Sequence, residues 1–160
     1  MNTNKLVKNS LLLGLLVVIT ISIVIPLPAG MGYINLSDAF IMLISVFTGL
    51  HSAMFIAGIG CMIADILLGY SQYALFTLIV KSLEAMVIVI TIKKIKNPYL
   101  AFILGGITMI VGYGISDWIL SGSLEYLSIS MVANFPQALG CVIIATIGLP
   151  IFSKVIKRLK

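Results

Sequence analysis

The chain has 160 residues, of which 61% are hydrophobic and 9% charged, and its mean hydropathy is +1.21. Soluble domains carry about 25% charged residues, so this chain has too little polar surface for a water-soluble globule. Its net charge of +5 is concentrated, because nine of the ten basic residues fall in clusters near residues 5–8, 93–96 and 154–160. Such clusters mark cytoplasmic membrane boundaries and lack the broad basic face that nucleic acid requires.

Apolar runs separated by polar or Gly/Pro-containing breaks predict six transmembrane helices. Their expected bounds are 10–28, 36–50, 53–69, 73–92, 99–120 and 126–149. The first is expected to be a retained span rather than a cleaved signal peptide, because five more apolar segments follow it. The second would cover only ~22 Å of a ~30 Å hydrocarbon core. We expect Pro136 to kink the sixth helix and Pro150 to end it.

The basic clusters also predict the orientation of these helices. Lys and Arg are absent from the three connectors expected outside the cell, at 29–35, 70–72 and 121–125. Positive charge is enriched on the cytoplasmic side. The sequence therefore predicts an all-α integral membrane bundle of six transmembrane helices, a single domain over 1–160 in the cell membrane, with both termini cytoplasmic.

Several polar side chains lie in or near the apolar segments. Lys81 and Glu84 are three residues apart, so they share a helix face and can pair. Asn134 and Gln137 are also three residues apart. Charge inside a bilayer costs about 2.5–3.5 kcal/mol per residue on insertion scales, so it faces a partner or a wet cavity. Because these groups all fall in the outer half or near the middle of the membrane, we expect a pocket open only to the outside.

Structural explanations of the same residues remain open. Asp65 and Asp117 are equally consistent with solvated helix ends, and Lys81 with Glu84 forms a plausible structural ion pair. Asn134 and Gln137 also suit interhelical hydrogen bonding. Aromatic residues near the outer mouth fit either an interfacial belt or a lid over a flat ligand, and these are Tyr33, Tyr70, Tyr73 and Trp118.

The order of these motifs resembles that of the substrate-binding S components of energy-coupling factor (ECF) vitamin transporters. The matching features are GYINLSDA at 32–39, Ala64-Asp65 with Gly69-Tyr70, then Tyr73, Thr77 and Lys81, and finally Asn134 with Gln137. The chain departs from the family pattern at Ser37, where Gly is common, and at Leu50, where Pro is usual. Ser10 and Gly14 stand where the family often has two alanines and still allow close helix approach.

The resemblance implies a protein without catalysis or cofactor that captures a vitamin or precursor from outside. It would dock through Ser10 and Gly14 on a transmembrane coupling subunit with two ATPases, and deliver its ligand by tilting in the lipid bilayer. A pyridine or hydroxymethylpyrimidine compound is ranked first and riboflavin second. The predicted substrate-binding residues are Asn35, Asp38, Asp65, Tyr73, Lys81, Glu84, Asp117, Asn134 and Gln137.

The sequence offers less support for two other classes of protein. A small channel or holin-like pore would continue its polar lining to the inner side, which this sequence does not. An intramembrane enzyme needs metal ligands or a nucleophile with a base. One His and the two separated residues Cys61 and Cys141 offer little for either, and both cysteines are expected to be small buried hydrophobes.

Overall fold

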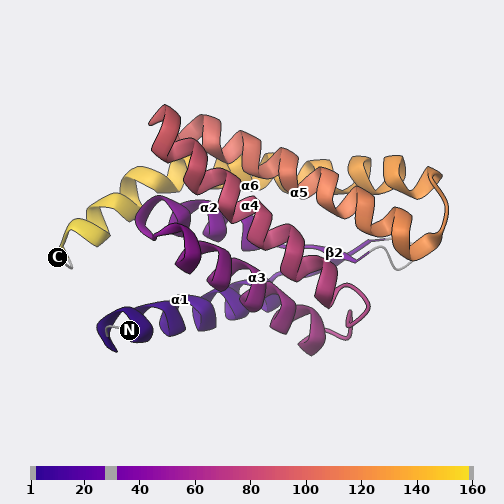
Figure 1. Ribbon diagram of the computed structural model, residues 1–160, viewed down its shortest axis with the longest axis horizontal. Helices are drawn as coiled ribbons and strands as arrows, with labels where there is room; N and C mark the ends of the chain where they lie inside the picture. The colour runs from indigo at the N-terminus through magenta and orange to yellow at the C-terminus, as the bar shows by residue number, and fades with distance from the viewer. Residues whose placement is uncertain (1–2, 28–31, 159–160) are drawn as a thin grey trace.

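The computed structural model describes residues 3–27 and 32–158, with side chains through Lys154. These residues form a bundle of six helices and one short strand pair (Figure 1). The elements are α1 (Thr3–Ser22), β1 (Ile25–Pro26), β2 (Tyr33–Ile34), α2 (Ser37–Phe47), α3 (Leu50–Leu67), α4 (Ala74–Ile95), α5 (Pro98–Ser121) and α6 (Glu125–Arg158). Within these residues, five helices are long and apolar enough to cross a membrane, and α2 is too short.

The short helix α2 lies at the centre of the bundle. It contacts each of the other five helices, and eight of its eleven residues are buried. Eleven residues cover only about 17 Å, well short of a bilayer core. The expectation of a membrane-spanning helix over 36–50 is therefore wrong for the helix itself. Protein rather than lipid surrounds most of α2, so its length is not set by the bilayer.

The first apolar segment ends earlier than expected. Helix α1 stops at Ser22, and the chain then runs extended so that Ile25 pairs with Ile34 and Pro26 with Tyr33 in an antiparallel register. Proline disfavours helical backbone in the residue before it, which explains the change from helix to strand near Pro26. The predicted helix over 10–28 is thus wrong for residues 23–27, and Pro28 lies outside the described residues.

Two helices run beyond their predicted ends. Helix α4 continues through Lys93 and Lys94 to Ile95, because positive side chains in the last turn favour the negative end of the helix dipole. Helix α6 contains both Pro136 and Pro150 and ends at Arg158 rather than Leu149. Membrane helices tolerate an internal proline where neighbouring groups satisfy the freed carbonyl. The expected stop at Pro150 is therefore wrong.

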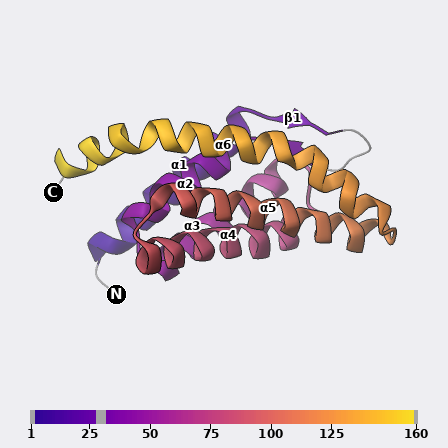
Figure 2. The ribbon, with the colours of Figure 1, turned by 90° about the horizontal axis from the view of Figure 1, so that it is seen from above.

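The two ends of the bundle differ in composition. Both termini and the α4–α5 turn lie at one end, which we call the basic end because it holds the three lysine-containing clusters (Figure 1). The β1–β2 pair and the α3–α4 and α5–α6 turns lie at the other end, the cavity end. Figure 2 shows the same separation from above, with α6 curving along the length of the bundle.

The apolar core fills the bundle from its middle toward the basic end. All six helices contribute to it, and residues fully shielded from solvent include Leu16, Ile41, Ile56, Ile88, Phe102 and Ala145. Small residues allow the helices to approach closely within this core. A Cβ added at Gly105, for example, would lie 2.7 Å from the Ile88 side chain. Closely packed apolar side chains therefore make up this core.

Candidate functional site

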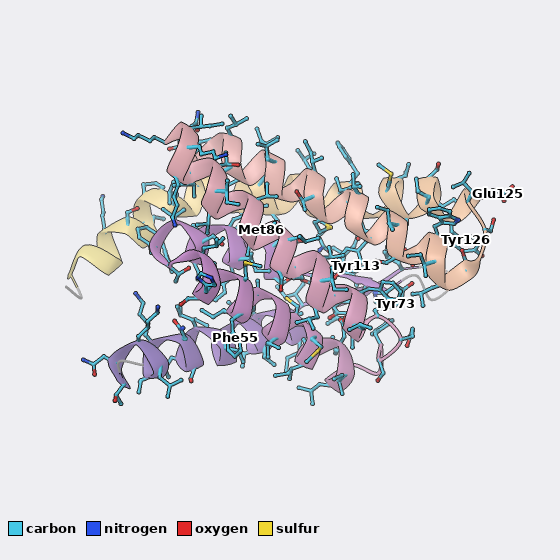
Figure 3. The ribbon with its side chains drawn as sticks, viewed as in Figure 1. Phe55, Tyr73, Met86, Tyr113, Glu125 and Tyr126 are labelled. Carbon is cyan, nitrogen blue, oxygen red and sulfur yellow. The ribbon has the colours of Figure 1, made fainter. Side chains whose placement is uncertain are left out.

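A cavity opens at the cavity end and is lined by residues of β2 and of all six helices. The cavity volume is about 20 Å³, within about 410 Å³ of space among the lining side chains that includes open solvent at the mouth. Tyr73 and Tyr113, which are labelled in Figure 3, both line it. The described lining residues are Thr20, Gly32, Tyr33, Asn35, Ser37, Cys61, Asp65, Tyr70, Tyr73, Thr77, Lys81, Tyr113, Asn134 and Gln137.

The floor of the cavity is a buried charged network. Lys81 forms an ion pair with Asp38 of α2, and its Nζ lies 3.4 Å from Glu84 Oε2. Gln137 Nε2 donates to Asp38 Oδ2 at 2.6 Å, and its Oε1 accepts the Asn35 backbone N–H at 2.8 Å. One ammonium therefore faces two carboxyl groups. The Gln137 amide of α6 connects α2 with Asn35, the residue that follows β2.

This network changes the expected pairing of Lys81. The short-range partner Glu84 is near, as the three-residue spacing predicted, but Lys81 donates its hydrogen bond to Asp38. Lys81 also stands 5.3 Å from the centre of the Tyr113 ring, within the range of a cation–π contact. Neither oxygen of Glu84 has a hydrogen-bond partner among the described residues.

The mouth of the cavity is built around Asp65, near the end of α3. Tyr33 donates its hydroxyl to Asp65 Oδ1 at 2.7 Å, and the Tyr70 N–H donates to the Asp65 carbonyl at 2.8 Å. The rings of Tyr33 and Tyr70 are 4.9 Å apart. Burial, and then the neighbouring Asp65, raise the pKa of Tyr33 well above its ordinary value. Its hydroxyl therefore stays protonated and remains a donor.

Hydrogen bonds also order the α4, α5 and α6 walls. Thr77 and Tyr113 are joined through their hydroxyls at 3.0 Å, and Tyr73 donates its hydroxyl to Asp117. Asn134 Nδ2 donates to the Ser130 carbonyl at 3.0 Å. Two aromatic rings and two polar side chains thus surround the space at fixed positions, which suits a flat ligand with polar edges.

Most predicted binding residues meet at this cavity. Six of the nine line it, namely Asn35, Asp65, Tyr73, Lys81, Asn134 and Gln137. The other three lie behind the lining: Asp38 and Glu84 flank Lys81, and Asp117 accepts from Tyr73. Trp118, considered for the aromatic lid, is outside the lining and 42% exposed. That position matches the alternative of an interfacial belt.

Sequence reasoning missed several lining residues. Thr20 lies in an unbroken apolar run, and Cys61 was expected to be only a small buried hydrophobe. Tyr113 had a usable signal, because it precedes Asp117 by four residues and so shares its helix face. Among the described residues, no group of three or more His, Cys, Asp or Glu is placed to hold a metal ion.

The two residues predicted to meet a partner are on the outside of α1. Ser10 and Gly14 are both exposed, and a Cβ added at Gly14 would meet nothing within 4 Å. Neighbouring positions on this helix present large apolar side chains, including Leu11, which is 70% exposed. The surface around Gly14 is therefore free to receive lipid or another helix.

Two comparisons place the chain among known proteins. The family model described as "ECF-type riboflavin transporter, S component" matches residues 1–158. A curated protein of Pyrococcus woesei, described as an uncharacterized protein in the gap 3' region, is 38% identical over 108 residues. That alignment covers 66% of this chain and 72% of the Pyrococcus protein.

Proposed function

Because the chain belongs to the family of ECF-type riboflavin transporter S components, we propose that it captures riboflavin or a similar flat vitamin from outside the cell. It is a multi-pass cell-membrane protein of a transporter family rather than an enzyme family. The observation that carries the proposal is the buried cavity, which is polar and aromatic at one end and backed by an apolar core. A molecule entering there is held, not conducted, and the protein needs a partner to release it.

Riboflavin replaces the pyridine and hydroxymethylpyrimidine compounds as the first candidate. The family description names riboflavin, and aromatic side chains of Tyr33, Tyr70, Tyr73 and Tyr113 line the cavity. Aromatic rings stack favourably on a flat heteroaromatic system. Pyridoxine and hydroxymethylpyrimidine remain the second candidates, since a smaller ring would use the same groups.

The orientation and the partners follow from the distribution of charge and of small residues. We place the basic end in the cytoplasm, with both termini, so that the cavity opens outward. The sequence contains no P-loop motif, so ATP hydrolysis belongs to two ATPase subunits bound to a transmembrane coupling subunit. The exposed Ser10–Gly14 surface of α1 is the proposed contact with that subunit, because small residues let helices pack closely.

A panel titration tests the capture function. Purified protein in lipid nanodiscs would be titrated calorimetrically with riboflavin, pyridoxine and hydroxymethylpyrimidine. We expect one compound, riboflavin first, to bind with one-to-one stoichiometry and a dissociation constant below micromolar. Failure of every compound to bind more tightly than millimolar, or ion conductance by the protein in planar bilayers, would favour the pore instead.

A further inference from the structure

One buried carboxylate oxygen at the mouth of the cavity accepts no hydrogen bond from the part of the chain that the structure describes. Asp65 lines the cavity, is 3% exposed, and gives its Oδ1 to the Tyr33 hydroxyl. Its Oδ2 has no hydrogen-bond partner among the described residues. Leaving a buried acceptor unpaired is costly, more so when it is charged. A ligand that brings a donor to this oxygen would remove that cost.

The cation that lines the cavity cannot compensate for a negative ligand. Lys81 and Asp65 are the only Lys, Arg, Asp or Glu side chains among the described lining residues. Lys81 already pairs with Asp38 and lies near Glu84. The charge of Lys81 is therefore already compensated by Asp38 before a ligand arrives. An anion entering the cavity would meet Asp65 without a free counter-charge.

Resting on the proposed function, we infer that Asp65 determines ligand selectivity: the cavity takes a neutral or cationic ligand that donates an N–H or O–H to this carboxylate, and rejects anionic derivatives. The Tyr33 hydroxyl fixes Oδ1, so Oδ2 is left for the ligand. Two like charges about 8 Å apart at an effective dielectric of 20 repel by about 2 kcal/mol. A phosphate ester of the vitamin should therefore bind far more weakly than the free vitamin.

The wild-type protein provides the first test. Riboflavin and riboflavin 5'-phosphate share the same ring system and differ by one dianionic group, so their dissociation constants would be compared by flavin fluorescence. We expect the phosphate ester to bind at least 10-fold more weakly, the factor being smaller at high salt. Equal affinities for the two compounds would overturn the inference.

Variants assign the effect to Asp65. Asp65→Asn keeps the shape of the side chain and removes its charge. We expect it to weaken riboflavin binding about 10-fold. It should also narrow the difference between the dissociation constants of riboflavin and riboflavin 5'-phosphate. Glu125→Gln is the matched control, because it removes an exposed carboxylate at the same end of the bundle, outside the cavity (Figure 3). Unchanged selectivity in Asp65→Asn, or the same change in Glu125→Gln, would contradict the assignment.

A pair of analogues tests the donor itself. Lumiflavin lacks the side-chain hydroxyls of riboflavin, and 3-methylriboflavin lacks its ring N–H. We expect one of the two to lose affinity in the wild type and to lose less in Asp65→Leu, where the acceptor is absent. Equal losses in both proteins would show that the missing donor does not meet Asp65. If the wild type binds no vitamin of the panel, the proposed function fails; if it binds riboflavin without these preferences, only the present inference fails.

Discussion

At the cavity end, buried side chains contact one another through ion pairs and hydrogen bonds, whereas toward the basic end they contact one another through apolar packing. Lys81, Asp38 and Gln137 represent the first kind, and Phe102 and Ile88 the second. All of these side chains are nearly or fully buried. Side chains that are equally buried at the two ends therefore depend on their neighbours in different ways: through ion pairs and hydrogen bonds at one end, and through apolar packing at the other.

This difference indicates which half of the molecule can determine ligand specificity. A polar group in the bilayer requires a partner of matching chemistry at a fixed distance. An apolar group requires only that its volume be filled. Changes at the cavity end should therefore alter both folding and ligand choice, while changes in the apolar core should alter folding alone.

Lys81→Met should have the largest effect. It would leave Asp38 and Glu84 buried without a cation, and breaking a buried pair in this way costs about 3–5 kcal/mol. Thermal unfolding in detergent would measure the loss. Since Lys81 hydrogen-bonds Asp38, the double variant Lys81→Met with Asp38→Asn should recover part of the stability. If Glu84→Gln restored stability to Lys81→Met and Asp38→Asn did not, the Lys81–Glu84 pair would be the more important one for stability.

Phe102→Ala should come next. The Phe102 side chain is fully buried, so its truncation should leave a cavity and reduce stability by about 3 kcal/mol. The adjacent Ile103, which is 49% exposed, is the control, and Ile103→Ala should change stability by less than about 1 kcal/mol. Riboflavin affinity at a temperature where each variant is folded should match the wild type. A large loss of riboflavin affinity in Phe102→Ala would contradict the claim that changes in the apolar core alter folding alone.

Tyr33→Phe should have a smaller effect on stability and a clear effect on binding. It removes the hydroxyl that donates to Asp65, and a hydrogen bond to a charged acceptor is worth about 1.5–3 kcal/mol. We expect riboflavin affinity to fall about 5-fold through misplacement of Asp65, as measured by fluorescence titration. Tyr99→Phe, at an exposed position of the basic end, is the control. Identical affinities in both variants would remove Tyr33 from the site.

Gly14→Leu should have the smallest effect on the isolated protein. Nothing lies within 4 Å of a Cβ added there, so stability and riboflavin affinity should stay at wild-type values. Co-purification with the coupling subunit should fall, because Leu prevents close helix approach. Gly140→Leu, at another helix position with open space around it, is the control. Full assembly of Gly14→Leu would exclude this surface as the contact.

The sequence was sufficient to locate the polar positions but not to pair them. Lys81 was singled out because charge in an apolar helix needs a partner, and the nearest one in the chain is Glu84. Its hydrogen bond goes instead to Asp38, 43 residues away. That choice depends on α2 lying inside the bundle, which its composition does not reveal. Long-range pairing is a property of packing, and spacing along one helix reports only local neighbours.

Helix ends show the same limit. Pro26 changed helix to strand, whereas α6 passed through Pro150 without ending. The two prolines differ in their surroundings, because residues near Pro26 pair with β2 and those near Pro150 continue an apolar helix. Thr20 and Cys61 were missed as lining residues for a related reason, since nothing in an apolar run marks which residue will face a cavity.

Riboflavin affinity in two conservative variants tests the central claim most directly. Asn134→Leu alters a buried residue that lines the cavity, and Phe102→Leu alters a buried residue of the apolar core. The account predicts that Asn134→Leu raises the dissociation constant at least 10-fold, about 1.4 kcal/mol, while Phe102→Leu stays within about twofold of the wild type. Wild-type affinity in Asn134→Leu together with a loss in Phe102→Leu would contradict it.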